Sequence, residues 1–328
     1  MQLIEKTFNK EDVEVLFDMY KNSIVKHPYL NPYNIYARNL FLAFKFKVLS
    51  IKNHGYIMST NQNYLFRTFF YPGIFNDENL YKDIYITLKH KKFVHGFAMS
   101  KTLHFYTDSQ ALLSVYDQVY NSLNRDVFVD VIYDNSVKRN RSTRHRINNN
   151  MKKAIESGIR IYFMDKMEPY IFREWYTNCY TYAYNNKPPF TYSQLHNYTN
   201  YLLERNLQKF IIAKLDDRVV GAIAILMDQY SNIGWFNLEA IGSEGREKGA
   251  GYLLMDTAIN VINEYNKVFE LYGKSYSDLD SKHIGILNFK KVFGTEIEIP
   301  YFLSNTPFNR FTNNFISLGR RIIQNEKQ

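Results

Sequence analysis

The chain has 328 residues, enough for about two domains, and a net charge of +9 that permits nucleic acid, anionic lipid or phosphorylated small molecules as partners. Hydrophobic residues make up 45% of the sequence, but no apolar run is long enough to span a bilayer. The single cysteine, Cys179, excludes an internal disulfide, and the first residues lack the apolar stretch of a signal peptide. We therefore expect a cytoplasmic protein in which Cys179 is a packed thiol.

The first third of the chain reads as a helix followed by strands. Apolar residues at helical spacing predict a helix over 10–24, which "HPYLNPYN" (27–34) interrupts. Strand-like runs follow over 39–51, 55–59, 64–73, 97–107 and 126–133. Helical patterns lie between them over 76–93 and 108–123.

The remaining two thirds give a clearer pattern, beginning with a basic helix over 142–157 that Gly158 ends. Further helices are predicted over 168–186, 193–206, 252–262 and 280–294. Strands are predicted over 159–164, 209–215, 219–228, 231–241, 267–273 and 296–303. Three of these strands follow one another directly as a meander, which argues for a mixed sheet rather than a strictly alternating one.

A glycine motif separates the strand over 231–241 from the next helix. Arg246, Gly249 and Gly251 form the pattern R-x-x-G-x-G. The first N–H groups of a helix have no intrahelical acceptor, and glycines let a ligand approach them closely, so the motif could hold a phosphate or diphosphate. The alternative is a plain glycine-containing entry into a helix. The dinucleotide fingerprint and the Walker pattern are both absent.

The order of strands, glycine motif, helix, strand and helix resembles the GCN5-related N-acetyltransferase (GNAT) fold. Two further stretches, "RSTRHRINNNMKKAIESGIRI" and "KHIGILNFKKVFGTEIEIPYFL", are similar to its FemAB, or peptidoglycan-bridge aminoacyltransferase-like, branch. The resemblance covers about 136–305 and implies an α+β fold with a mixed sheet. It also implies two tandem halves, a degenerate GNAT-like domain over 1–135 and an acyltransferase domain over 136–328.

The resemblance implies acyl-CoA, most simply acetyl-CoA, as a co-substrate. No metal is expected, because the eight histidines show no metal-ligand spacing. The diphosphate of acyl-CoA would meet Arg246, Lys248, Gly249, Ala250 and Gly251, and the strand before the motif would diverge from its neighbour to bind the pantetheine amide. The family's usual general acid, a tyrosine in the last helix, is replaced here by Phe289. Another group must then act as the acid, or direct acid assistance is not used.

Acyl transfer to an amine also needs a base and a group that relieves the departing thiolate. Glu239 lies on the strand before the motif and could be the base; the alternative is a solvated or ion-paired carboxylate. Asn237 is expected on the same face by strand alternation and is a candidate substrate ligand. Tyr276 and Asp278 are candidates for the acid, in a loop that could instead be a polar connection with a cap at 280 or 281. His283 is a further candidate substrate ligand.

The basic run over 138–153 has three interpretations: a solvated helix face, a contact to an anionic or nucleotide-sugar acceptor through Arg144, or tRNA binding. Three functions follow. The first is acyl transfer from acyl-CoA to an amine, on an amino sugar or nucleotide-linked sugar for envelope polysaccharide. The second is an aminoacyl-tRNA-dependent transferase. The third is a non-catalytic module that binds acyl-CoA.

Overall fold

A computed structural model of the chain resolves into two compact units. The first comprises Met1–Val25, Lys45–Phe128 and Glu298–Gln328, and the second comprises Lys26–Phe44 and Val129–Ile297. The described residues are 4–6, 9–44, 46–51, 54–62, 66–77, 79–81, 83, 94–97, 126–134, 139–265, 267–271, 274–275 and 281–301. The division into two tandem acyltransferase-like halves at 135/136 stays a prediction.

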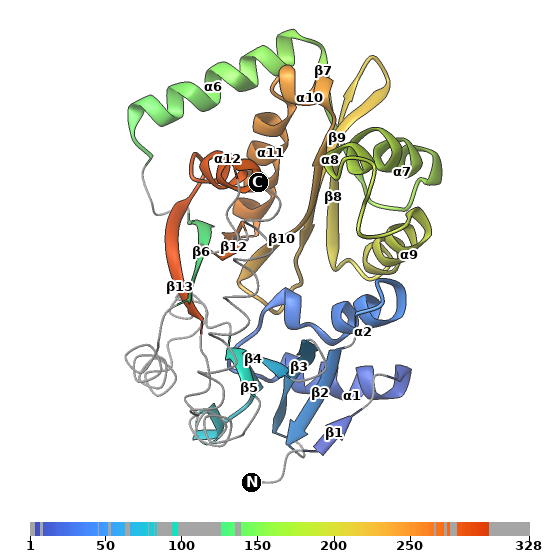
Figure 1. Ribbon diagram of the computed structural model, residues 1–328, viewed down its shortest axis with the longest axis vertical. Coiled ribbons are helices and arrows are strands. Elements are labelled where there is room, and N and C mark those ends of the chain that lie inside the picture. The colour runs from blue at the N-terminus through green and yellow to red at the C-terminus, as the bar shows by residue number, and fades with distance from the viewer. Residues whose placement is uncertain are drawn as a thin grey trace, which may run out of the picture. The chain divides into compact units, whose positions relative to one another are not determined.

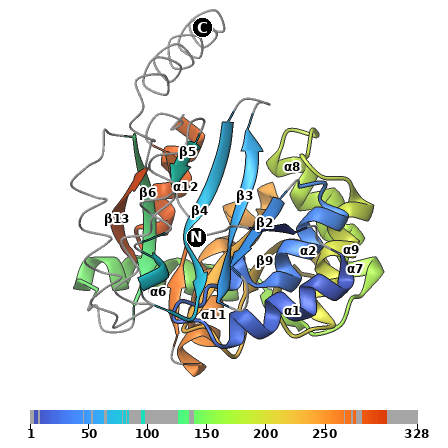
Figure 2. The same ribbon diagram turned by 90° about the horizontal axis from the view of Figure 1, so that it is seen from below.

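The first unit contains a five-stranded sheet in the order β1-β2-β3-β4-β5. Its strands are β1 (Ile4–Lys6), β2 (Phe46–Ile51), β3 (Gly55–Gln62), β4 (Phe66–Phe75) and β5 (Val94–Phe97). The neighbours from β1 to β4 are antiparallel, β5 runs parallel to β4, and Figure 2 shows β2, β3 and β4 side by side. Helix α1 (Lys10–Lys21) packs on β3 and β4 and confirms the first predicted helix. The predicted elements over 76–93, 97–107 and 108–123 lie almost wholly outside the described residues.

The prediction of a strand over 39–51 is wrong in its first part. A 3-10 turn, η1 (Pro28–Leu30), is followed by helix α2 (Pro32–Phe41), and β2 begins only at Phe46. Asn31 caps α2 by accepting a hydrogen bond from the Tyr33 amide at 3.1 Å, and Pro32 occupies the first helical position, where its missing N–H is not needed. The aromatic run at the end of α2 therefore belongs to a helix.

The second unit is built on an eight-stranded mixed sheet in the order β12-β6-β11-β10-β9-β8-β7, with β13 also paired to β6. Its strands are β6 (Asp126–Tyr133), β7 (Ile159–Met164), β8 (Gln208–Leu215), β9 (Arg218–Leu226), β10 (Ile233–Ile241), β11 (Val268–Glu270), β12 (Lys274–Ser275) and β13 (Thr295–Tyr301). The strands β7 to β10 are antiparallel neighbours, whereas β10 and β11 are parallel. The predicted mixed sheet with a central meander is confirmed.

Helices cover both faces of this sheet (Figure 1). One face packs against α6 (Arg141–Glu156), α11 (Ala250–Glu264) and α12 (Ser281–Lys290) through a core that includes Ile223, Phe236 and Leu254. The other packs against α2, α7 (Pro169–Trp175) and α9 (Tyr192–Leu203) through Trp175, Tyr198 and Trp235. A π-helical turn, η2 (Tyr176–Tyr180), and α8 (Thr181–Ala183) continue α7. Below, these are called the α11 face and the α2 face.

Candidate functional site

The strands β10 and β11 pair over only part of their length. The parallel pairing joins Ile233 to Val268 and ends where Trp235 meets Glu270, whereas β10 continues to Ile241 with β9 as its partner. In the described part of the chain, the far half of β10 therefore has an unpaired edge on the β11 side. Its free N–H and C=O groups can bind an extended amide-containing ligand, which agrees with the divergence expected from the family resemblance.

The R-x-x-G-x-G motif is more helical than the sequence suggests. A short helix, α10 (Ser243–Glu247), precedes Gly249, which has φ +83° and is the N-cap of α11. The Gly249 amide donates to Arg246 O at 3.2 Å, and the Tyr252 amide donates to Gly249 O at 3.1 Å. Between them, Ala250 and Gly251 begin α11, and the first N–H groups of a helix have no acceptor within that helix.

Both of these amides belong to buried residues at the first turn of α11. The dipole of a fifteen-residue helix such as α11 favours negative charge at this end. Arg246 and Lys248 add two cations to the same turn of chain. The Arg246 Nε also donates to Ile241 O at 3.0 Å, which fixes the base of its side chain.

Helix α6 lies directly against the motif. A Cβ atom added at Gly249 would come within 2.9 Å of the Asn150 carbonyl oxygen and 3.8 Å of the Ala154 Cβ, both on α6. At Gly251 an added Cβ would lie 3.0 Å from Ile241 Cδ1 and 3.4 Å from Phe289 Cζ. The motif therefore needs glycine for close packing as well as for the left-handed torsion of Gly249.

Glu239 lies on the unpaired half of β10, where it pairs with Ile223 of β9. Its carboxylate forms no hydrogen bond with any described residue. Burial raises the pKa of Glu239 above its usual value of 4.5, and Lys290 and Arg246 oppose this rise. A carboxyl with a raised pKa and no fixed partner is suited to accept a proton.

The last helix supplies a lysine rather than a tyrosine beside Glu239. Phe289 packs on Tyr252 and Phe293, with ring centroids 5.2 and 5.3 Å away, so it fills the core between α11 and α12. The next residue, Lys290, is buried, donates to the Leu271 carbonyl and lies 4.6 Å from the Phe236 ring centre. Sequence reasoning did not single out Lys290, although it stands next to the position where the family has its acid.

Asn237 does not share a face with Glu239, and this part of the prediction is wrong. A bulge between Phe236 and Leu238 inserts Asn237 into β10 without a partner on β9, so the alternation of side chains shifts by one. Asn237 instead accepts from Arg38 Nη2 at 2.8 Å and donates to Gln208 Oε1 at 2.8 Å, both on the α2 face. Its role as a substrate ligand stays a prediction.

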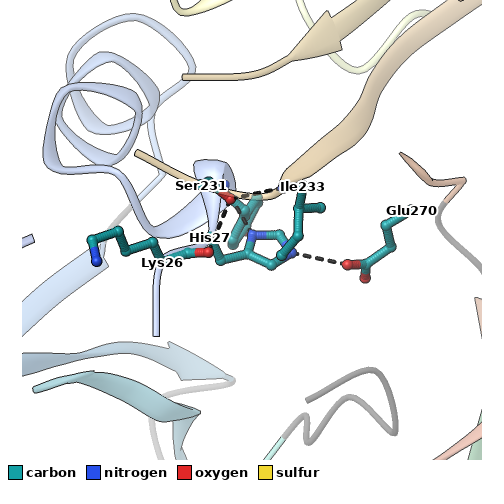
Figure 3. A network of polar contacts seen from close by, with 6 residues as sticks. Lys26, His27, Ser231, Ile233 and Glu270 are labelled. Carbon is teal, nitrogen blue, oxygen red and sulfur yellow. Dashed lines mark hydrogen bonds and ion pairs between the residues drawn. The ribbon is translucent and has the colours of Figure 1, made fainter. Parts of the chain in front are cut away.

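A hydrogen bond between His27 and Glu270 holds the segment before α2 against the sheet (Figure 3). His27 Nδ1 accepts from the Tyr29 amide at 3.1 Å, so Nε2 carries the proton that it donates to Glu270 Oε2 at 2.9 Å. The Ser231 hydroxyl donates to the Lys26 carbonyl at 2.9 Å. Because Glu270 is the last residue of β11 to pair with β10, this network fixes α2 beside the point where the two strands diverge.

The remaining predicted site residues are not brought to Glu239 by any described contact. Arg144 is exposed on α6, six positions and thus about 9 Å along the helix from Asn150, whose carbonyl meets the motif. Tyr276 and Asp278 lie outside the described residues, and His283 lies in α12 without a described side chain. In the described chain, no helix could cross a membrane and no three His, Cys, Asp or Glu residues could hold a metal ion.

Comparisons with known proteins agree with this architecture. Residues 170–277 match the acetyltransferase (GNAT) family. The C-terminal domain of a lysylphosphatidylglycerol synthetase from Agrobacterium fabrum is similar in structure, with 13% identity and a TM-score of 0.64 over 93% of this chain and 95% of that one. FemX shows 10% identity and a TM-score of 0.59, covering 94% of this chain and 99% of its own.

A third structure, L-PGS from Bacillus licheniformis, shows 10% identity and a TM-score of 0.58 over 95% of this chain and 96% of that one. No curated protein matches the chain by sequence. At these identities the structural likeness establishes the fold. The chain therefore carries a domain of the GNAT family, set in a fold that it shares with FemX and the lysylphosphatidylglycerol synthetases.

Proposed function

We propose that the protein is an N-acyltransferase that takes its acyl group from acyl-CoA. The observation that carries this proposal is the buried first turn of α11 at Ala250 and Gly251, whose N–H groups have no acceptor within that helix and follow the left-handed Gly249. A diphosphate there would satisfy both N–H groups, and Arg246 and Lys248 would balance its charge. From this point pantetheine would follow the unpaired edge of β10 toward Trp235, where the strands diverge.

The described residues offer a base and a cation for the reaction. The Glu239 carboxylate takes a proton from the acceptor ammonium, directly or through water, so that the neutral amine attacks the thioester carbonyl. The bond from carbon to sulfur then breaks and leaves a thiolate, which takes up the second proton that the attacking nitrogen loses as the amide forms. Lys290, whose charge already acts on Glu239, relieves this negative charge in place of the absent tyrosine. An amino sugar or nucleotide-linked sugar as acceptor stays a prediction of the sequence.

Calorimetric titration with acetyl-CoA tests the donor. The wild-type protein should bind, and Arg246→Ala should weaken binding about tenfold or more, because a charge-assisted hydrogen bond is worth about 1.5–3 kcal/mol. Lys152→Ala is the matched control, since its side chain is 72% exposed on α6 and the change removes the same charge. Absence of heat with the wild type would exclude the donor, and equal affinities of both variants would exclude this site.

A second candidate, an aminoacyl-tRNA-dependent transferase, is favoured by the similarity to FemX and by the basic face of α6, where Arg141, Arg144 and Lys152 are exposed. Filter retention of charged tRNA at several salt concentrations tests it. Binding to this helix should fall steeply with salt, and reversing the three charges should flatten the slope. If tRNA is not retained at low salt, this candidate is excluded and acyl-CoA remains.

A further inference from the structure

Arg38 is a buried cation without an anionic partner. Its side chain belongs to α2, only 8% of the residue is exposed, and no described carboxylate lies within ion-pair distance. Its Nη2 donates to Asn237 Oδ1 and the guanidinium also hydrogen-bonds the Tyr198 side chain, whereas its buried Nε has no partner among the described residues. A guanidinium has five N–H groups, and the one on Nε is left without an acceptor in the described chain. Buried charges in proteins are normally paired, so an acceptor is missing here.

Aromatic rings surround this guanidinium. Its Cζ lies 4.7 Å from the ring centre of Tyr29, 5.6 Å from those of Phe44 and Tyr198, and 5.5 Å from that of Trp235. Such rings stabilise the cation through their faces and exclude water, but they carry no negative charge to pair with it. The four rings thus surround the guanidinium of Arg38 but do not provide an anion that would pair with it.

The neighbouring side chains form a network that offers a further donor. Tyr198 donates to Asn34 Oδ1 at 2.9 Å, and Asn237 Nδ2 donates to Gln208 Oε1 at 2.8 Å. Gln208 is 2% exposed, and its Nε2 has no hydrogen-bond partner. Two buried side chains of one connected network thus each present an unused N–H group.

We propose that Arg38 binds a carboxylate of the acceptor amine, so that the acceptor is an amino acid or another amine that carries a carboxylate. Arg38 is the one cation of this described network. A carboxylate carries one negative charge and is planar, so it fits a single guanidinium in both charge and geometry. A phosphate dianion would leave a net negative charge among aromatic rings. The assignment of this carboxylate to the acceptor rests on the proposed acyl transfer; the binding site itself does not.

The position of Arg38 agrees with an acceptor site. Trp235, one of its four rings, is the last residue of β10 to pair with β11, and Asn237 is the bulge immediately after the divergence. Arg38 thus lies on the α2 face beside the opening, whereas Glu239 and the glycine motif belong with the α11 face. A donor and an acceptor that approach from opposite faces would meet where the strands diverge.

Thermal unfolding with and without ligand tests the site without any acyl donor. The probes are single L-amino acids, the carboxamide of each and inorganic phosphate, all at millimolar concentration. At least one amino acid should raise the unfolding midpoint of the wild type, and its carboxamide should not. The site is excluded if no amino acid stabilises the protein, if the carboxamide acts equally well, or if phosphate alone is effective.

Asn237→Asp provides the sharpest variant. It places a carboxylate within 2.8 Å of the Arg38 guanidinium without a change of shape, and Gln208 can turn its free Nε2 toward the new oxygen. This variant should unfold at a higher temperature than the wild type and lose the response to amino acids by at least tenfold in apparent affinity. A retained response would overturn the proposal.

Arg38→Met, which keeps the length of the side chain without its charge, should also abolish the response. If that variant fails to fold, Asn237→Asp still decides. Because no acyl-CoA is present, a negative result here excludes the carboxylate site and leaves the donor proposal standing. Conversely, failure to bind acetyl-CoA excludes the donor and leaves the Arg38 site intact.

Discussion

Replacing Gly249 by alanine should destabilise the second unit strongly. The residue has φ +83°, a conformation that costs an L-residue about 1–2 kcal/mol. The added Cβ would also lie 2.9 Å from the Asn150 carbonyl oxygen, a backbone atom of α6 that cannot move without shifting the helix. Overpacking of this kind typically costs about 1–3 kcal/mol. Together these effects predict a loss of about 2–5 kcal/mol.

Urea unfolding followed by circular dichroism measures this loss, and Gly285→Ala is the matched control. Gly285 lies in α12 with nothing within 4 Å of an added Cβ and without a positive φ, so alanine there should stabilise the helix by about 0.5–1 kcal/mol. Opposite signs for the two substitutions would support the described packing of α6 on the motif. A change of less than about 0.5 kcal/mol for Gly249→Ala, within the range of ordinary surface substitutions, would refute it.

Three further outcomes are expected. Burial raises the pKa of Glu239 above 4.5, so its contribution to stability is fully present below pH 4.5 and is lost as the pH rises through the raised pKa. Glu239→Gln should therefore gain stability relative to the wild type as the pH rises from 4.5. A difference between the two proteins in urea unfolding that stays constant with pH would contradict this. An added Cβ at Gly234 would clash with Ile262 Cδ1, the atom that Ile262→Val removes. Gly234→Ala and Ile262→Val should therefore each destabilise the protein but show a favourable coupling of about 1 kcal/mol when combined, and additive effects would argue against the contact. Burial raises the pKa of Cys179 from 9.0 to about 12, so at pH 8 its alkylation should be roughly a thousandfold slower in the folded protein than in urea, as mass spectrometry would show.

Local patterns predict most of the second unit because its elements are strongly periodic. The basic helix, the meander and the helix after the glycine motif all form as expected. Helix α2 is missed because its aromatic end continues without a break into the apolar residues before β2. The N-cap Asn31 and the following Pro32 are the signal that could have identified it.

The site is harder to predict because its contacts join residues far apart in the chain. Glu239 and the glycine motif follow from their place between a strand and a helix. The bulge at Asn237 does not, because the pairing with β9 alone reveals the extra residue. Arg38 meets Asn237 across 199 positions, and nothing near either residue marks the partner. The one local sign of a site is Arg38 itself, a single arginine among the aromatic residues of α2.

The most direct test of the central claim observes the amides at the start of α11 while CoA binds. Nitrogen-15 labelling of the glycines gives a spectrum in which Gly249 and Gly251 report on the motif and Gly285 on a distant surface. Added CoA should shift the Gly251 resonance strongly while that of Gly285 stays in place. If CoA leaves both motif glycines unchanged at concentrations that saturate the protein, or does not bind, the diphosphate site is absent and the proposed donor is wrong.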